Sequence, residues 1–302
     1  MSDEHWLDSE TGAWLLAAVV DRIVKDYRID RTEAASLVKE VWAGRTKLQL
    51  LVTQGKPPAE ILRTREFESA ATSARKAVYY GLRRYRQTHP DRGARLLNEL
   101  KALEPAGPAL KRDELAAQLA GLHVSMAERT AGLSLFYDQL FSLIGQPRTV
   151  LDVGCGVHPL VFPFDGQGGA VESYLAGDKD AQAIAAVEAY AAVRSDGRLQ
   201  GLIWDLAQGW AAINQANSSQ WFDVVFMFKL IPHLARQQPH LLPVAAQAPG
   251  RLLVITASRQ SLTKKQSIER RERAVLHRFV TLTGRRVIGE FSVDEEFGLV
   301  LE

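Results

Sequence analysis

The sequence contains a single cysteine, Cys155, among 302 residues. One cysteine excludes an internal disulfide framework and a zinc cluster built on several thiolates, and we expect no metal site. The first ten residues are acidic and lack the basic-then-apolar pattern of a secretion signal. No apolar run reaches the length of a membrane span. We therefore expect a soluble, cytoplasmic protein without a membrane partner.

An excess of charge of one sign is also lacking, because 37 Lys and Arg residues stand against 35 Asp and Glu residues, for a net charge of +2. This balance excludes a protein whose whole surface is basic, so any polyanion site must be local. Heptad repeats are absent too, and we expect a monomer. The 46% of hydrophobic residues is ample for one large domain or two modest ones.

The two halves of the chain differ in hydrophobic periodicity. Residues 10–145 show apolar residues at helical spacing and almost no strand pattern. After Arg148, strands and helices alternate, which predicts a doubly wound, mostly parallel sheet. The expected strands are Thr149–Val153, Tyr174–Gly177, Leu202–Trp204, Asp223–Phe228, Arg251–Thr256, Arg286–Phe291 and Phe297–Leu301. The last two are joined by a connection too short for a crossover, so they should form an antiparallel hairpin. We assign residues 1–122 to a helical N-terminal domain and residues 123–302 to the α/β domain.

A glycine turn follows the first of these strands. Gly154 and Gly156 flank Cys155 directly after Thr149–Val153, as in a loop that lets the backbone approach a nucleotide closely. The third glycine of a dinucleotide fingerprint is missing, and so is the Lys-Ser/Thr pair of a phosphate-binding loop. The form Leu-Asp-Val-Gly-Cys-Gly resembles motif I of S-adenosylmethionine (AdoMet) methyltransferases.

Three acidic residues stand at successive strand ends, namely Asp152, Asp178 and Asp205. A carboxylate at the second strand end can accept both ribose hydroxyls of a nucleoside, which is the role expected of Asp178. Asp205 at the third strand end suits an adenine amino group. Each aspartate could instead cap a helix or form a turn. Three in succession favour AdoMet binding.

Basic residues are concentrated in two segments. Between Arg63 and Arg95 they are in clear excess and are interleaved with three tyrosines; this segment includes Arg75, Lys76, Arg83 and Arg84. From Arg259 to Arg286 there are nine Lys or Arg residues against two acids. A charge run is often a solvated helix face, and that interpretation stays open. The alternative is an RNA-docking surface, because Arg makes bidentate phosphate contacts and aromatic rings stack on bases.

The segment Phe228-Lys-Leu-Ile-Pro-His-Leu-Ala-Arg-Gln237 resembles the FKLLP-L-ERQ motif of a known family. The family comprises the aminoglycoside-resistance methyltransferases that modify N7 of guanosine 1405 in 16S rRNA. Residues 123–129, 135–141, 154–160 and 258–262 resemble further segments of that family in the same order. The resemblance covers roughly residues 120–262. His158 stands where the family usually has Asn, and residues 263–273 depart from the family's target-contacting stretch, which leaves the target nucleotide open.

The resemblance implies a class I (Rossmann-like) AdoMet-dependent methyltransferase with a seven-stranded, mostly parallel sheet and a helical N-terminal domain. Arg129 would hold the AdoMet carboxylate, and the turn of Gly154, Cys155 and Gly156 would face the methionine part. Asp178 would bind ribose, and Asp205 with Leu206 would frame the adenine. The residues expected to contact RNA are Lys229, Arg259, Lys264, Lys265, Arg270 and Arg271, with Arg75, Lys76, Arg83 and Arg84 in the N-terminal domain.

The expected substrate needs no general base, because guanine N7 carries a lone pair and no proton. Catalysis would then rest on proximity and orientation, and we nominate no catalytic acid or base. The implied partner is 16S rRNA in the assembled 30S subunit, and the implied outcome is aminoglycoside resistance. Three alternatives stay open: an enzyme for another rRNA or tRNA position, a small-molecule methyltransferase of the same fold, and a non-catalytic RNA-binding relative.

Overall fold

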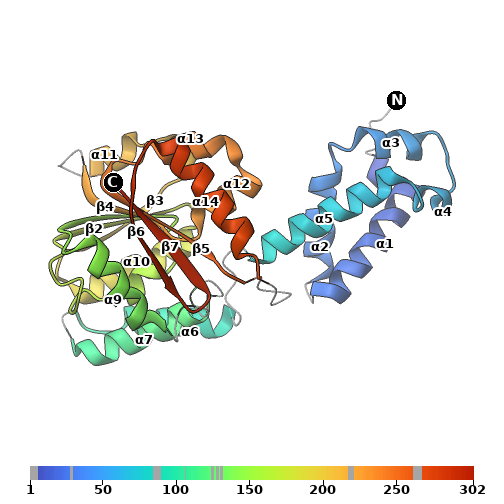
Figure 1. Cartoon of the computed structure of the whole chain (residues 1–302). Coiled ribbons are helices and arrows are strands. Elements are labelled where there is room, and N and C mark those ends of the chain that lie inside the picture. The colour runs from blue at the N-terminus through green and yellow to red at the C-terminus, as the bar shows by residue number, and fades with distance from the viewer. Residues whose placement is uncertain are drawn as a thin grey trace. The chain divides into compact units, whose positions relative to one another are not determined.

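The computed structural model divides into two compact units, Met1–Arg86 and Gln87–Glu302 (Figure 1). The structure describes residues 6–27, 30–83, 90–105, 107–123, 126, 129, 132–216, 221–260 and 267–302. Among the described residues, no helix is both long and apolar enough to cross a membrane.

The first unit is helical, as the periodicity of its sequence predicts. It contains η1 (Trp6–Asp8), α1 (Glu10–Tyr27), α2 (Arg31–Trp42), α3 (Thr46–Thr53), α4 (Pro58–Ile61) and α5 (Arg65–Arg83). Trp42 is fully buried at its centre, stacked on Trp6 with ring centroids 6.3 Å apart and edge-on to Phe67 at 6.0 Å. The Trp42 indole nitrogen donates to the Ala70 carbonyl at 3.1 Å, so the buried polar atom is satisfied.

The second unit is built on a seven-stranded sheet with the order β3-β2-β1-β4-β5-β7-β6. The strands are β1 (Thr149–Val153), β2 (Ser173–Asp178), β3 (Leu199–Ile203), β4 (Phe222–Met227), β5 (Gly250–Ser258), β6 (Val287–Val293) and β7 (Glu296–Leu301). The first five are parallel, and β7 pairs antiparallel with both β5 and β6. The fold class and the closing hairpin predicted from the sequence are thereby confirmed.

The third strand begins earlier than the sequence predicts. It runs from Leu199, where it pairs with Tyr174, to Ile203, which pairs with Asp178; the expected Trp204 lies beyond its end. The start of this strand is difficult to predict from the sequence, because neither Gln200 nor Gly201 favours strands. Gly201 is tightly packed, since a Cβ there would lie 2.9 Å from the Glu188 side chain on the covering helix.

Helices cover both faces of the sheet (Figure 1). On one face lie α6 (Pro90–Lys101), α7 (Ala109–Gly121), α9 (Leu133–Ile144), η3 (His158–Val161) and α10 (Ala181–Arg194). On the other lie η4 (Leu206–Gln208), α11 (Ala211–Ala216), α12 (Leu230–Gln237), η5 (Pro239–Leu241), α13 (Leu242–Ala246) and α14 (Glu269–Thr283). Each face has its own buried cluster, as expected for a sheet with apolar residues on both sides.

The boundary between the units differs from the one expected after residue 122. Helices α6 and α7 pack against α10 and η3, and they bury Leu96, Leu100 and Leu119 in the core of the second unit. Helical periodicity shows that a helix has an apolar face but does not show which core that face joins. The division therefore falls between Arg86 and Gln87.

Candidate S-adenosylmethionine site

The turn after β1 has the backbone conformation that its glycines permit. Gly154 and Gly156 have φ values of +65° and +52°, in the left-handed region that glycine adopts without strain. The backbone nitrogens of Gly154 and Cys155 donate to the Gly177 carbonyl at 2.8 and 3.2 Å. The turn therefore lies against the end of β2, at the carboxyl edge of the parallel strands where ligands bind in such folds.

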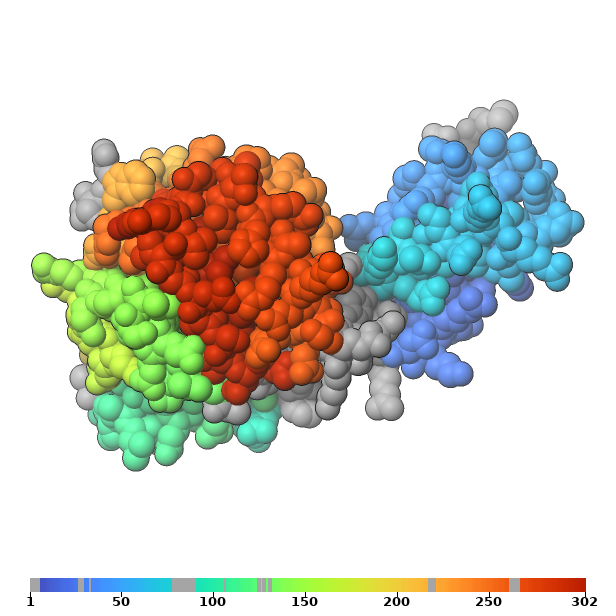
Figure 2. All heavy atoms as spheres, viewed as in Figure 1, coloured from blue at the N-terminus to red at the C-terminus, as the bar shows by residue number. Residues whose placement is uncertain are grey.

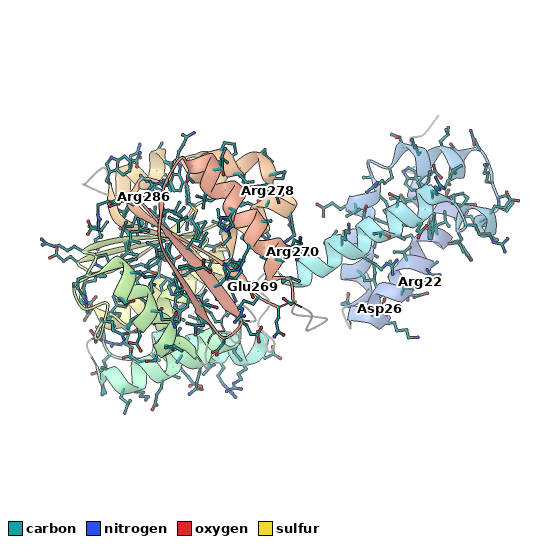
Figure 3. All side chains as sticks on the ribbon, in the orientation of Figure 1. Arg22, Asp26, Glu269, Arg270, Arg278 and Arg286 are labelled. Carbon is teal, nitrogen blue, oxygen red and sulfur yellow. The ribbon has the colours of Figure 1, made fainter. Side chains whose placement is uncertain are left out.

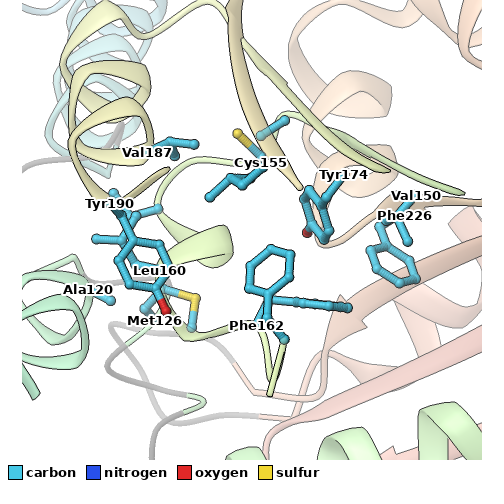
Figure 4. Close-up of a cluster of buried hydrophobic side chains, with 14 of the residues drawn as sticks. Ala120, Met126, Val150, Cys155, Leu160, Phe162, Tyr174, Val187, Tyr190 and Phe226 are labelled. Carbon is cyan, nitrogen blue, oxygen red and sulfur yellow. The ribbon is translucent and has the colours of Figure 1, made fainter. Parts of the chain in front are cut away.

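Cys155 points away from this edge and into the core. Its thiol is buried among apolar side chains that include Val187 and Leu160 (Figure 4). Burial raises the pKa of the Cys155 thiol well above its ordinary value, so the group is a packed neutral thiol. Any ligand contact predicted for Cys155 would thus come from its backbone.

Asp178 joins the glycine turn to the end of β2. One carboxylate oxygen accepts from the Gly156 nitrogen at 2.8 Å, and the other accepts from the Asp180 nitrogen at 2.9 Å. Burial raises the pKa of Asp178, and the two backbone donors oppose that rise. Each oxygen has a second lone pair, so the group can still accept hydroxyl donors. The expected ribose-binding aspartate is therefore placed and oriented beside the turn.

Asp205 and Leu206 follow β3 at the same edge. Asp205 caps η4 by accepting from the Ala207 nitrogen at 2.9 Å, so the capping use considered for it is present. The other carboxylate oxygen of Asp205 lies 4.0 Å from Lys179 Nζ, and the Asp205 side chain is 36% exposed. Leu206 is buried. The pair combines an apolar wall with an accessible carboxylate, which suits an adenine ring.

Arg129 forms a buried ion pair with Glu296, the first residue of β7. Arg129 Nε lies 3.0 Å from Glu296 Oε2, and Nη2 lies 2.6 Å from Oε1. The guanidinium also lies over the rings of Phe136 and Phe228, at 4.5 and 4.8 Å from their centroids. Both charged side chains are 5% exposed. The arginine expected to bind the AdoMet carboxylate is thus held in one orientation by the protein itself.

Lys229 reaches the same carboxylate from the end of β4. It has a left-handed backbone with φ of +57°, and its nitrogen donates to Thr256 Oγ1 at 3.0 Å. Its Nζ lies 3.4 Å from Glu296 Oε2. Burial alone would raise the pKa of Glu296, but the charges of Arg129 and Lys229 outweigh it and lower the pKa to about 2. Glu296 is therefore ionised under all ordinary conditions.

The basic residues near the C-terminus differ in how many of their hydrogen bonds and ion pairs lie within the protein. Arg259 donates from Nε to Glu269 at 2.9 Å and from Nη1 to the Asp294 carbonyl at 3.2 Å, which ties the end of β5 to α14 and the hairpin turn. Arg271 pairs with the buried Glu272 yet is 63% exposed. Arg270 and Arg271 line an open hollow of about 500 Å³ together with Ser267, Ile268 and Ala274.

Part of the expected RNA-binding set can be placed on the surface. Glu269 and Arg270 begin α14, and Arg278 lies farther along it (Figure 3). This helix belongs to the orange-to-red face in the space-filling view (Figure 2). In the N-terminal unit, Arg75 and Lys76 are exposed on α5. Lys264, Lys265, Arg84 and the side chain of Arg83 lie outside the described residues.

Sequence reasoning missed Glu296 altogether. It is 4% exposed and lies at the head of a strand in which every residue is buried. An acidic residue directly before the apolar run Phe297–Leu301 is a weak hint, because buried carboxylates need a partner. The partner, however, is 167 positions away in the chain.

Comparison with known proteins gives a consistent pattern. A family model described as "Ribosomal RNA methyltransferase (FmrO)" matches residues 75–241, more than half of the chain. The chain is 30% identical over 125 residues to a 16S rRNA (guanine(1405)-N(7))-methyltransferase of Proteus mirabilis and 34% identical over 100 residues to one of Micromonospora echinospora. These matches cover 41% and 33% of this chain, and 42% and 36% of the two relatives.

A solved structure is similar in fold over nearly the whole chain. The 16S rRNA methyltransferase RmtF in complex with S-adenosyl-L-homocysteine is similar with a TM-score of 0.56 and 18% sequence identity. The similarity covers 97% of this chain and 98% of that structure. It therefore concerns the fold of the sheet domain and also that of the helical N-terminal region.

Proposed function

Because the chain belongs to the FmrO family of ribosomal RNA methyltransferases, we propose that it transfers a methyl group from AdoMet to N7 of guanosine 1405 in 16S rRNA. The two curated relatives carry that activity in their names, and each matches over less than half of its own length. The proposal extends their activity to this chain.

The observation that carries the proposal is the set of residues at the carboxyl edge of the sheet. A turn with two left-handed glycines adjoins the oriented Asp178 carboxylate. Arg129 and Lys229 both contact Glu296, so two cations lie together at this edge, where they could receive a ligand carboxylate. Asp205 and Leu206 complete a chain of groups matching carboxylate, ribose and adenine in turn. The residues present therefore fit AdoMet, which would supply an electrophilic methyl group.

The proposed reaction requires no general acid or base from the protein. Guanine N7 presents a lone pair without a proton, so the chain would act by binding both partners and holding them in line. Lys229 lies at the end of β4, where an acceptor base would approach, and its charge favours an RNA. Arg270, Arg271, Arg75 and Lys76 would bind phosphates of that RNA.

The wider setting follows from the proposed target. The partner would be 16S rRNA in the assembled 30S subunit, met by a monomer in the cytoplasm. A methyl group and a positive charge at N7 would obstruct and repel a cationic aminoglycoside, so the modification would confer resistance. The N-terminal unit would dock the enzyme on the subunit through the basic residues of α5.

The test is transfer of a labelled methyl group from AdoMet to isolated 30S subunits, with the modified nucleotide located by reduction, strand cleavage and reverse transcription. Label in 16S rRNA with cleavage at guanosine 1405 supports the proposal. Cleavage at another guanosine would keep the enzyme class and change the target, which the divergent residues 263–273 make a meaningful outcome. Absence of label in 30S subunits, while AdoMet binds, would refute rRNA methylation.

A further inference from the structure

Glu296 lies at the edge of the sheet where the ligand is expected to bind. It pairs in register with Ser258, the last residue of β5, and so lies at the carboxyl edge of the parallel strands. It also lies at the end of the hairpin turn that connects β6 to β7. Its side chain is 5% exposed and is ionised, so it must be matched by cations and hydrogen bonds.

The contacts of Glu296 connect two parts of the proposed site. Through Arg129 it contacts the segment before β1, which is expected to bind AdoMet; through Lys229 it contacts the end of β4, where the acceptor is expected. The hydroxyl oxygen of Thr256 accepts from the backbone nitrogen of Lys229 at 3.0 Å, which fixes the backbone from which the lysine side chain extends. Glu296 is thus the common partner of two cations that come from distant segments.

The geometry of the ion pair bears on how Arg129 could receive a ligand. Both hydrogen bonds to Glu296 come from the Nε and Nη2 edge of the guanidinium. The Phe136 and Phe228 rings lie against the guanidinium carbon at 4.5 and 4.8 Å. A guanidinium is planar and carries more N–H donors than one carboxylate accepts. With one edge held and aromatic rings against it, the group has little freedom to rotate.

We propose that Glu296 is the positioning residue for recognition of the AdoMet carboxylate: it fixes Arg129 so that the remaining guanidinium N–H groups are presented to that carboxylate. This inference rests on the proposed function, because it assumes that AdoMet is the ligand. It assigns Glu296 no contact with the reacting atoms.

The test uses two ligands that differ in the part Arg129 would recognise. S-adenosylhomocysteine carries the amino-acid carboxylate, and 5′-methylthioadenosine is the corresponding nucleoside thioether without it. Binding of each to the full chain is measured by titration calorimetry for the parent protein and for Glu296→Gln. The matched control is Glu290→Gln on β6, an acid that pairs with an arginine at the surface, Arg273, and is 46% exposed.

Glu296→Gln should weaken S-adenosylhomocysteine by about tenfold or more, the loss typical when the partner that orients a ligand-binding group is removed. Binding of 5′-methylthioadenosine should stay unchanged, and Glu290→Gln should alter neither ligand. The Arg129→Lys variant lacks the planar guanidinium that Glu296 would orient. In that background, Glu296→Gln should not further lower the affinity for S-adenosylhomocysteine relative to that for 5′-methylthioadenosine. Should Glu296→Gln fold poorly, Glu296→Asp keeps the charge, withdraws it by one methylene, and should also weaken S-adenosylhomocysteine selectively.

Two results would overturn the inference. An equal loss for both ligands would mean that Glu296 maintains the fold and does not orient Arg129. Unchanged binding of both would mean that Arg129 needs no orienting partner. If the parent protein bound neither ligand, the proposed function itself would fall, and this outcome is distinguishable because it appears before any substitution is made.

Discussion

His158 Nδ1 lies 2.7 Å from Asp152 Oδ2, and both side chains are buried beneath the glycine turn. The other ring nitrogen lies 2.7 Å from the Tyr137 hydroxyl, and the Tyr174 hydroxyl donates to the same Asp152 oxygen at 2.8 Å. A neutral imidazole satisfies all these atoms if Nδ1 donates to Asp152 and Nε2 accepts from Tyr137, and we assign that tautomer. Asp152 is therefore an anchor for η3, while Asp178 and Asp205 lie along the ligand edge.

Replacing His158 should destabilise the protein without removing any ligand contact. His158→Ala leaves Asp152 and Tyr137 each short of a buried hydrogen-bond partner and opens a cavity, so the free energy of unfolding should fall by about 2–4 kcal/mol. Urea denaturation measures the change. The control is His240→Ala, an exposed histidine on η5, which should stay within about 0.5 kcal/mol of the parent. A similar effect at both positions would show that the buried network adds little.

Asp178→Asn should weaken S-adenosylhomocysteine binding by about tenfold to a hundredfold, because hydrogen bonds from ribose hydroxyls to a charged carboxylate are lost. The matched control is Asp223→Asn. Asp223 also accepts two backbone N–H groups, from Arg148 at 2.7 Å and Thr149 at 3.0 Å, but it lies near the start of β4, at the opposite edge of the sheet from the glycine turn. It should cost stability and leave affinity unchanged. Calorimetry on both variants would contradict the ribose assignment if their affinities fell alike.

Acid should reduce the contribution of Glu296 to stability. Its pKa in the folded protein is lowered to about 2 from an ordinary value of 4.5, so the contribution is complete above pH 4.5 and is lost as the pH falls toward 2. The difference in unfolding free energy between the parent and Glu296→Gln should therefore shrink as the pH is lowered through this range. Urea denaturation at a series of acidic pH values tests this, and a constant difference would contradict it.

Arg270→Gln should weaken binding to 30S subunits and reduce its dependence on salt. Each lost phosphate contact lowers the slope of log affinity against log salt by about one. Arg278→Gln is the matched control, because Arg278 is an exposed arginine farther along α14, away from the hollow at the helix start (Figure 3). Filter binding at several salt concentrations measures both slopes. Equal slopes for the two variants would indicate a diffuse charge effect without a phosphate site at Arg270.

Charge reversal of Arg75 and Lys76 to Glu should reduce methyl transfer to 30S subunits by about tenfold or more, while S-adenosylhomocysteine binding stays unchanged. Both side chains are exposed on α5, so the fold should tolerate the change. Reversal of Arg22 and Lys25, exposed on α1, changes the net charge by the same amount and serves as the control. Equal losses from the two double variants would refute a specific docking role for α5.

Local features of the site could be predicted from the sequence because they depend on neighbouring residues. The apolar run Thr149–Val153 followed by two glycines is sufficient to predict a strand and a left-handed turn, and both are present. Asp178 follows its strand closely enough that the shared edge of a parallel sheet places it beside that turn. Arg129 was nominated from a family resemblance, and its sequence neighbourhood alone would have indicated a solvated charge.

The sequence by itself determined the order of strands and helices, the closing hairpin and the glycine turn, since each follows from periodicity or from the conformational freedom of a residue type. Only the tertiary structure decided that α6 and α7 join the sheet domain, that Asp152 turns toward His158, and that Glu296 holds Arg129. The physical reason is the same in all three cases. Which apolar face meets which core, and which charge meets which partner, depends on packing and strand register between segments that are distant in the chain.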